Sequence, residues 1–300
     1  MNKKILLLRS HDLYNTGVYF AKGFHELGVD LIDIQFDPHK PVFPSKFPQA
    51  DLLLIVDSGL PVIVPGHETY AGMVGYLSID SAHKLQIHKT YINQCDFDLI
   101  WVAQKHVVGE FGDKGRWLPV AADAEMHAFR PQMAANESRW RRWLTPNAFD
   151  IGMCAAPYPH RYRFETLFKR AGLSVHFVYR KKFGTDATRE LARGTIGFNV
   201  GAGFDGKKGK DINMRVFETM ANGQAMLLTN TYEGLGYETL FEEGVHFVGF
   251  RTEAEAVEKA VHYARHPEEA IRIARVGQQH ILNHHTYRHR CQTILDALSS

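Results

Sequence analysis

The sequence predicts an α/β protein with two parallel-sheet domains, and two observations lead to this prediction. Short runs rich in leucine and β-branched residues alternate with amphipathic stretches, and strands that are apolar throughout are typical of parallel sheets covered on both faces. The alternation lapses over residues 134–147, AANESRWRRWLTPN, and then starts again. We therefore expect domains over residues 1–143 and 144–300.

Five strands and three helices are expected in the first half. The strands are apolar runs bounded by polar or glycine-containing turns, at Lys4–Leu8, Val29–Ile34, Asp51–Val56, Gly75–Ile79 and Asp98–Val102. The stretches between them carry apolar residues at helical spacing, at Gly17–Leu27, His83–Cys95 and Lys105–Gly112.

The second half repeats this pattern. Expected strands are Asp150–Cys154, Val175–Tyr179, Thr195–Val200, Ala225–Thr229 and His246–Phe250. A helix over Tyr162–Ala171 precedes one over Ile212–Ala221, which the pair Asn222-Gly223 ends as a left-handed stop. From Glu253 onward the chain is helical, with Pro267 at a helix start and a break near Asn283.

Composition excludes several classes of protein. The 300 residues are 45% apolar and 23% charged with a net charge of +2, which argues against disorder. The three cysteines are far apart, which disfavours a disulfide framework or zinc ribbon and fits a reducing compartment. The N-terminus has only four consecutive apolar residues, and no apolar run reaches membrane-spanning length, so we expect a cytoplasmic protein.

Gly201, Gly203 and Gly206 form a G-x-G-x-x-G pattern that is typical of dinucleotide-binding enzymes. The context differs, because KKGKD separates the glycines from the helix, and the candidate acid Glu218 lies inside that helix. An NAD-dependent oxidoreductase is therefore disfavoured. The loop instead predicts either an anion site at a helix start or a solvated basic turn, with three lysines (Lys207, Lys208, Lys210) and two capping residues (Asp211, Asn213).

Within that helix, Arg215 and Glu218 are three residues apart and so lie on one side. One interpretation is a weak surface ion pair. The other is that Arg215 meets a phosphate while Glu218 accepts hydrogen bonds from ribose hydroxyls, for which a carboxylate offers two acceptor oxygens.

Several stretches resemble group 1 glycosyltransferases, with the greatest similarity to the spore-maturation (CgeB-type) branch. The stretches in the second half are DIGMCAAPYPHRYRFETLF, NMRVFETMANGQAMLLTN, LFEEGVHFVGF and HHTYRHRCQTIL. FDLIWVAQKHVVGEFGDKGRWLPVAAD resembles the end of the N-terminal half of these proteins. The resemblance covers most of the chain from Asp51 onward.

This resemblance implies a GT-B fold: two Rossmann-like domains facing across a cleft, with the last helix, around His285–Leu298, returning to the first domain. It also implies a nucleotide-diphosphate sugar donor, UDP-linked, held mainly by the second domain, with no cofactor and no catalytic metal. Many relatives carry two glutamates seven residues apart. Glu218 matches the second, but Lys210 occupies the first position, and Asp211 is one residue away.

Other candidate residues lie at predicted strand ends and turns. Asp80 and His83 follow the strand Gly75–Ile79, where an acid or imidazole suits proton removal from an acceptor; alternatively, Asp80 caps a helix beginning at Ser81. His67, on a glycine-bounded loop, is a second candidate base. Gly17 follows the first strand at a turn that either lets the donor approach or simply begins a helix capped by Asn15 or Thr16.

Two histidine groups complete the candidate residues. His160 and Arg161, after two prolines, are expected to contact phosphate or base. His262 and His266 are four residues apart on a helix, but no third ligand of matching spacing follows, so we expect a solvated face and no metal.

The expected function is sugar transfer from a nucleotide-diphosphate donor to a hydroxyl acceptor. The alternative is a non-catalytic nucleotide-sugar or sugar-binding protein that keeps the fold. The acceptor is open among a modified base in DNA, a protein, a glycan and a lipid-linked sugar. Basic patches at residues 139–143 (RWRRW) and 206–210 (GKKGK) are the reason to include DNA.

Overall fold

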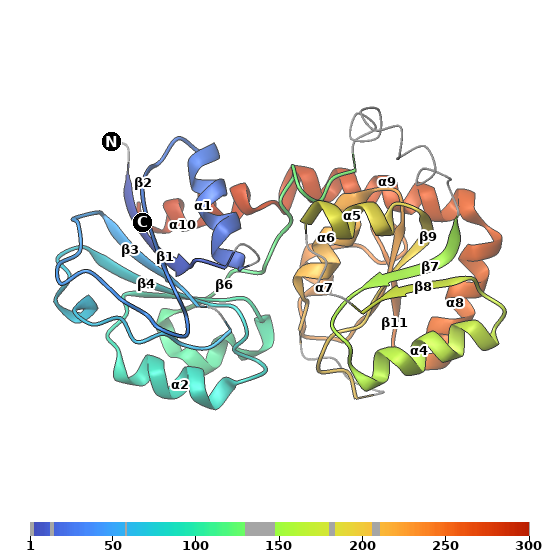
Figure 1. The fold of residues 1–300 in the computed structure, drawn as a ribbon, viewed down its shortest axis with the longest axis horizontal. Coiled ribbons are helices and arrows are strands. Elements are labelled where there is room, and N and C mark those ends of the chain that lie inside the picture. The colour runs from blue at the N-terminus through green and yellow to red at the C-terminus, as the bar shows by residue number, and fades with distance from the viewer. Residues whose placement is uncertain are drawn as a thin grey trace. The chain divides into compact units, whose positions relative to one another are not determined.

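The computed structural model describes residues 3–12, 15–57, 59–129, 148–179, 184–205 and 211–299. The chain forms two compact units, residues 1–120 with 287–300 (unit 1) and residues 121–286 (unit 2) (Figure 1). The domain boundary expected at residues 143 and 144 lies outside the described residues.

Unit 1 contains a six-stranded parallel sheet in the order β2-β1-β3-β4-β5-β6. Its strands are β1 (Lys4–Ser10), β2 (Asp30–Phe36), β3 (Leu52–Val56), β4 (Met73–Ser78), β5 (Leu99–Val102) and β6 (Gly115–Trp117). Every side chain of β3 is buried, as expected for a strand covered on both faces. The reversal of strand order places the topological switch point between β1 and β3.

The helices of unit 1 follow the predicted order with shifted bounds. α1 (Thr16–Glu26) and α2 (Leu85–Gln94) are α-helical, and a short 3-10 turn, η1, spans His67–Thr69. The expected helix Lys105–Gly112 is instead the 3-10 segment η2 (Lys105–Lys114), interrupted at Gly112, whose φ of 62° is left-handed. The strand β6 was not predicted, because three residues carry too little periodicity.

The C-terminal helix α10 (Tyr287–Ala297) packs on α1 within unit 1, which confirms the predicted return of the last helix. The Tyr287 ring stacks on Tyr19 with centroids 5.0 Å apart. Buried Arg290 donates from Nε to the Pro119 carbonyl at 2.7 Å, and burial lowers the pKa of its guanidinium to about 10. These contacts bind the end of the chain to unit 1.

Unit 2 contains a five-stranded parallel sheet in the order β11-β10-β9-β7-β8. Its strands are β7 (Phe149–Cys154), β8 (Val175–Val178), β9 (Gly194–Asn199), β10 (Met226–Asn230) and β11 (Val248–Phe250). The switch point of this sheet lies between β7 and β9. A cluster of phenylalanines beneath α4 (Pro159–Arg170), including Phe164, Phe168 and Phe198, fills the core.

The remaining helices of unit 2 are α5 (Gly184–Leu191), α6 (Met214–Asn222), α7 (Tyr237–Leu240), α8 (Glu253–Arg265) and α9 (Pro267–His284). Gly223 ends α6 with a φ of 70°, and Pro267 begins α9, both as predicted. The break expected near Asn283 falls at His285. α5 and α7 were not predicted, since they contain only eight and four residues.

All three cysteines are free thiols, in agreement with the prediction against disulfides. None of the helices in the described part of the chain combines the length and the apolar character that crossing a membrane requires.

Candidate functional site

Arg161 joins the two strand ends at the switch point of unit 2. Its Nη2 donates to the Val200 carbonyl after β9 at 2.8 Å, and its Nη1 donates to the Ala156 carbonyl after β7 at 2.7 Å. The side chain is buried, and burial lowers the pKa of the guanidinium, with Arg215 also acting to lower it. A cation is therefore held at the sheet edge where ligands bind in open α/β sheets.

His160 lies beside Arg161 at the start of α4. A backbone hydrogen bond links it to Gly201, yet burial and the neighbouring Arg161 lower the pKa of its imidazole. Its Nε2 is buried with no hydrogen-bond partner among the described residues. The imidazole is therefore neutral near pH 7, and Nε2 is available to a ligand.

Gly201 and Gly203 belong to a tight turn after β9, in which Phe204 N donates to Gly201 O at 3.2 Å. A Cβ on Gly201 would lie 3.0 Å from Asp211 Oδ1, so glycine lets Asp211 approach. The side chain of Asn230, at the end of β10, accepts from Gly201 N at 3.0 Å. Asn230 was not predicted, although its position at a strand end would have identified it.

The N-terminus of α6 points into the same region. Asn213 occupies the N-cap position, as one of the two predicted capping residues, but its side chain makes no capping hydrogen bond. The first-turn N–H groups of a helix need acceptors, which an anion supplies well. The three lysines predicted to assist, Lys207, Lys208 and Lys210, lie outside the described residues, as do Gly206 and the basic patch RWRRW at residues 139–143.

Glu218 is almost fully buried on α6, with a side-chain exposure of 3%. Arg215 Nη1 lies 2.6 Å from one carboxylate oxygen, and His127 Nε2 lies 3.3 Å from the other. The predicted alternative of a surface ion pair is therefore wrong, because both partners are largely enclosed. His127 was not predicted, since it lies far from Glu218 in sequence.

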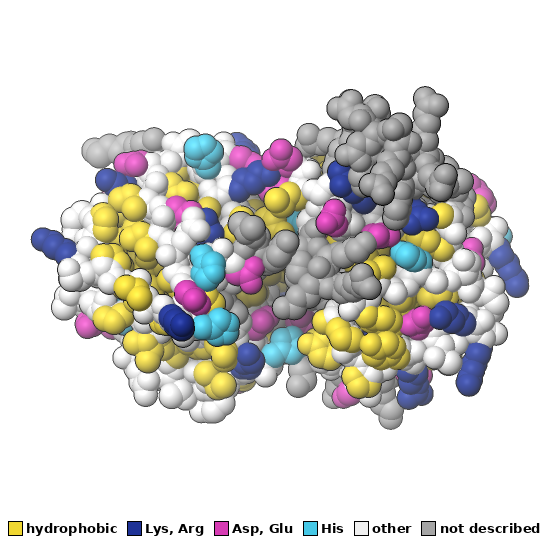
Figure 2. Space-filling model, viewed as in Figure 1, with side chains coloured by type: hydrophobic (Ala, Val, Ile, Leu, Met, Phe, Trp, Pro, Cys, Tyr) yellow, Lys and Arg dark blue, Asp and Glu magenta, His cyan; other side chains and the backbone are white. Residues whose placement is uncertain are grey.

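Aromatic side chains border this region at the start of α4. Tyr158 and Tyr162 are exposed, and Arg161 lies under the Tyr158 ring, 4.9 Å from its centroid. Figure 2 shows hydrophobic side chains gathered on unit 2 where Figure 1 draws the start of this helix. Such exposed rings offer a stacking surface for a base.

In unit 1, Asp80 and His83 lie in a turn after β4, with His83 N donating to Asp80 O at 3.1 Å. The alternative prediction that Asp80 caps a helix beginning at Ser81 is wrong. Helix α2 begins four residues later, at Leu85, with Lys84 at its N-cap and no side-chain capping bond. The Asp80 carboxylate instead faces Gly59, where an added Cβ would lie 2.8 Å from Oδ2.

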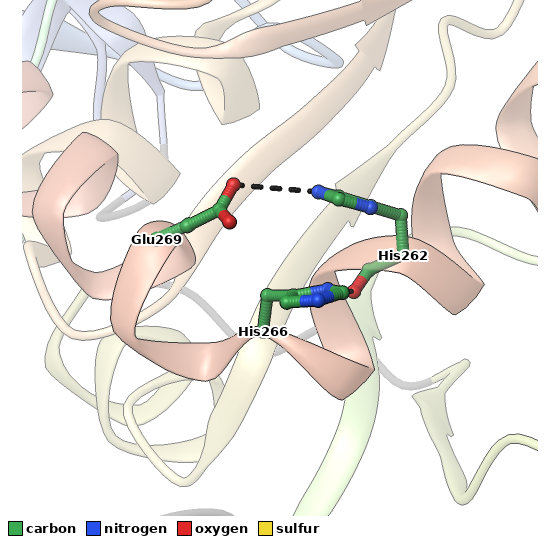
Figure 3. A group of neighbouring side chains, drawn as sticks. All are labelled: His262, His266 and Glu269. Atoms are coloured by element: carbon green, nitrogen blue, oxygen red, sulfur yellow. Dashed lines mark hydrogen bonds and ion pairs between the residues drawn. The ribbon is translucent and has the colours of Figure 1, made fainter.

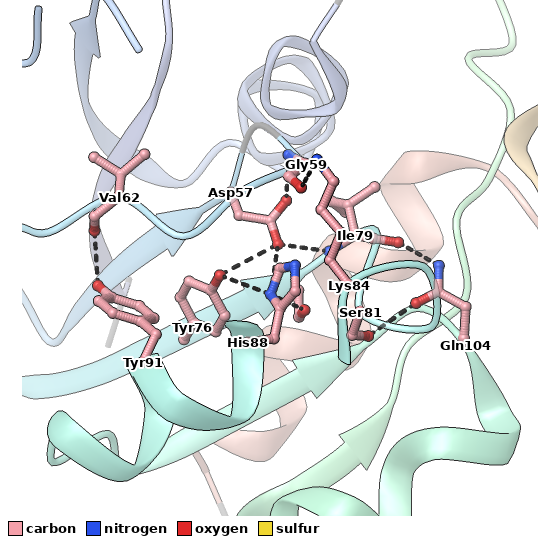
Figure 4. Close-up of polar contacts among 11 residues, drawn as sticks. Asp57, Gly59, Val62, Tyr76, Ile79, Ser81, Lys84, His88, Tyr91 and Gln104 are labelled. Atoms are coloured by element: carbon pink, nitrogen blue, oxygen red, sulfur yellow. Dashed lines mark hydrogen bonds and ion pairs between the residues drawn. The ribbon is translucent and has the colours of Figure 1, made fainter. Parts of the chain in front are cut away.

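Asp57 lies at the switch point of unit 1, directly after β3, and was not predicted (Figure 4). Its carboxylate accepts from Gly59 N and Ile79 N, each at 2.9 Å, and from the Tyr76 hydroxyl at 3.3 Å. Despite these bonds, burial raises the pKa of this carboxyl to about 7, and the nearby Asp80 charge adds to the shift. A strongly perturbed acid at a strand end is typical of functional sites.

His88 on α2 completes this buried network. Its Nδ1 lies 3.0 Å from Ser78 Oγ and 3.8 Å from Asp57 Oδ2. Burial lowers the pKa of this imidazole to about 4, with Lys84 contributing. Near pH 6, therefore, Asp57 is protonated and His88 is neutral.

We expect Asp57 and His88 to make opposite and nearly equal contributions to the pH dependence of the unfolding free energy. Because the folded pKa of Asp57 is raised from 3.8 to about 7, its contribution to the unfolding free energy falls as pH rises through that window. The folded pKa of His88 is lowered from 6.5 to about 4, so its contribution rises with pH over nearly the same window. When His88 is replaced by asparagine, only the contribution of Asp57 remains. The unfolding free energy of His88→Asn should therefore fall by about 2 kcal/mol more than that of the wild type as pH rises from 5 to 7, measured by urea denaturation. The exposed His25→Asn serves as control, and an equal pH profile in the two variants would contradict the assignment.

The other two candidates in unit 1 lie elsewhere. The His67 ring is buried, stacks on Phe97 and holds Nδ1 2.7 Å from the Val64 carbonyl. Phe97 precedes β5 whereas Asp80 follows β4, so the structure does not bring His67 to Asp80. Gly17 is the second residue of α1 and donates its N–H to Asn15, which caps the helix as one alternative predicted. A Cβ on Gly17 would lie 2.6 Å from Arg9 Cβ.

Comparison with known proteins agrees with this architecture. Residues 155–296 match the family model described as glycosyl transferase-like. No curated protein matches the chain in sequence.

Among solved structures, the chain is similar to HepE of Anabaena in complex with UDP and glucose, at 12% identity and a TM-score of 0.66, over 99% of this chain and 100% of that one. It is similar to sucrose-phosphate synthase of Thermosynechococcus elongatus, at 10% identity and a TM-score of 0.62, over 98% of each chain. It is also similar to T4 phage BGT in complex with UDP and Mn²⁺, at 12% identity and a TM-score of 0.57, over 99% and 100% of the two chains. The chain thus has a GT-B fold, and its residues 155–296 match the glycosyl transferase-like family model.

Proposed function

We propose that this protein is a glycosyltransferase that moves a sugar from a nucleotide-diphosphate donor, UDP-linked, to a hydroxyl acceptor. Two findings on the same segment of the chain support this function. The glycosyl transferase-like match spans α4 to α10, and the same segment gathers Arg161, Arg215 and Glu218 at one edge of the sheet of unit 2. The structural similarity to HepE, bound to UDP and glucose, supports a UDP-linked donor.

We assign the donor to unit 2 as follows. The diphosphate binds at the N-terminus of α6 beside Arg161 and Arg215, where fixed N–H groups and cations stabilise the negative charge of the leaving group. Glu218 accepts hydrogen bonds from the ribose hydroxyls, and His160 Nε2, the unprotonated nitrogen of a neutral ring, accepts a hydrogen bond from an N–H of the base. In unit 1, Asp80 accepts the proton of the acceptor hydroxyl, with His83 beside it in the same turn.

Replacing Glu218 by alanine should weaken binding of UDP by about 1–3 kcal/mol, or about 5- to 150-fold, because a charged acceptor is lost. Titration calorimetry on the folded variant measures the effect. Glu268→Ala, on the first turn of α9, is the control and should bind like wild type. Unchanged affinity in Glu218→Ala would remove the ribose assignment.

We propose further that transfer needs no catalytic metal, since cationic side chains and a helix N-terminus are available for the diphosphate. Activity should therefore persist in excess EDTA. A loss of activity that Mn²⁺ or Mg²⁺ restores would contradict this, and the Mn²⁺ in the BGT complex makes the test necessary.

The alternative is a binding protein without transferase activity, which the lysine at position 210 in place of a glutamate favours. A thermal-shift panel of nucleotide sugars identifies the donor, and release of UDP from that donor then separates the two functions. Binding without release, with every acceptor class tested, supports the binding protein. Mass analysis of DNA containing modified bases, proteins, glycans and lipid-linked sugars identifies the acceptor.

A further inference from the structure

Three side chains that could bind a metal meet where α8 ends and α9 begins (Figure 3). His262 lies in the last turn of α8, His266 links the two helices, and Glu269 lies in the first turn of α9. One potential ligand atom from each residue lies within 4.8 Å of the other two. Sequence spacing identified only the two histidines, because the turn at Pro267 is what brings Glu269 back beside His262.

The distances suit a small divalent ion. His262 Nε2 lies 3.3 Å from Glu269 Oε2, and two ligands about 2.0–2.1 Å from a tetrahedral zinc ion are separated by about 3.3–3.4 Å. The two imidazole rings stand on the same side of the junction, with centroids 4.4 Å apart (Figure 3). Small side-chain rotations would bring the third ligand to the same ion.

The orientation of His266 is also that of a ligand. Its Nδ1 lies 2.8 Å from the backbone carbonyl of His262, so this nitrogen carries the proton and donates it. The lone pair of the neutral ring is then on Nε2. Metal-bound histidines in proteins almost always donate their second ring N–H to such a carbonyl or carboxylate.

The position is open to solvent, so a hydrated ion can enter. His262 lines an open cavity of about 600 Å³ together with Lys259 and Tyr263. The ammonium of Lys259 is engaged elsewhere, donating to Gly249 O and lying 3.7 Å from a Glu243 carboxylate oxygen. It therefore need not move for a cation to bind at His262.

We propose that His262, His266 and Glu269 bind one zinc ion that fastens α8 to α9, with water at the fourth position. Two imidazoles and one carboxylate favour zinc over Mg²⁺ or Ca²⁺, which prefer all-oxygen sites. The ion would lie across the junction of two helices, so its binding would resist separation of α8 from α9.

The test is calorimetric titration of Zn²⁺ into the full chain after EDTA treatment and removal of the chelator. We expect one ion per chain, a melting temperature that rises with Zn²⁺ concentration, and no response to Mg²⁺. His262→Ala, His266→Ala and Glu269→Gln should each weaken zinc binding at least about tenfold. Loss of a group that only hydrogen-bonds to a metal ligand already costs about 10- to 100-fold in affinity, and loss of a ligand itself should cost no less. Co²⁺ should give the intense visible absorption of a tetrahedral site in the wild type but in none of these three variants.

Two control variants make the result specific. His25→Ala removes an exposed histidine of α1 and should leave binding unchanged. His280→Ala disrupts a second histidine cluster on α9, where His280 Nε2 lies 3.1 Å from His285 Nε2. Loss of binding in His280→Ala but not in His262→Ala would overturn the proposal, as would the absence of one-to-one binding in the wild type.

Discussion

Replacing Asp80 by asparagine is expected to lower turnover about a hundredfold or more, while donor affinity and melting temperature change little. Asparagine keeps the size and polarity of the side chain but cannot accept a proton, so only a step that needs a base is affected. Turnover is measured as UDP release in the presence of acceptor, and melting by calorimetry.

A second variant separates catalysis from structure. Because α2 begins at Leu85 with Lys84 at its N-cap, Asp80→Ala removes no cap from that helix, and its turnover should fall as far as that of Asp80→Asn. Near-normal turnover in Asp80→Asn would contradict its assignment as the base. The same assay on His83→Ala and His67→Ala would then test the two remaining candidates.

Replacing Arg215 by methionine is expected to reduce the unfolding free energy by about 3–5 kcal/mol, because it leaves the Glu218 carboxylate buried without its cation. The side-chain exposures of Arg215 and Glu218 are 16% and 3%, so water compensates for only a small part of the lost interaction. Urea denaturation measures the effect. The double variant Arg215→Met/Glu218→Gln should recover most of the stability, since it removes the unpaired charge as well.

The chain offers a matched control for this pair. Arg163 Nη2 lies 2.7 Å from Glu253 Oε2, nearly the same separation as in the Arg215–Glu218 pair, but the Arg163 side chain is 68% exposed. Arg163→Met should therefore cost less than about 1 kcal/mol. Equal costs for the two arginines would show that burial does not govern the Arg215–Glu218 interaction.

Local patterns in the sequence determined most of the fold. A run such as LLLIV at 52–56 forms a buried strand in any parallel sheet, and Asn222-Gly223 ends a helix through the backbone preference of glycine. These signals depend on neighbouring residues, so they are readable without a structure. Elements of one or two turns, such as α5 and α7, and the short strand β6, were missed because they contain too few residues to show a period.

Strand ends also carried information about the candidate sites, but only in part. Asp80, after β4, was predicted from its position, and the same reasoning applies to Asp57 after β3 and Asn230 after β10. What the sequence could not show is which strand ends are neighbours. The strand order places Asp57 at the switch point of unit 1, and this order follows from packing of the whole sheet.

By itself, then, the sequence determined the α/β class, the return of the last helix and the pairing of Arg215 with Glu218, because each depends on local spacing or on a recognisable motif. Only the tertiary structure decided that this ion pair is buried, that His127 covers its far side, and that Glu269 joins His262 and His266. Burial and contacts of this kind depend on how helices and turns pack against one another. The free energy of that packing is shared among residues from distant parts of the chain, so no local pattern records it.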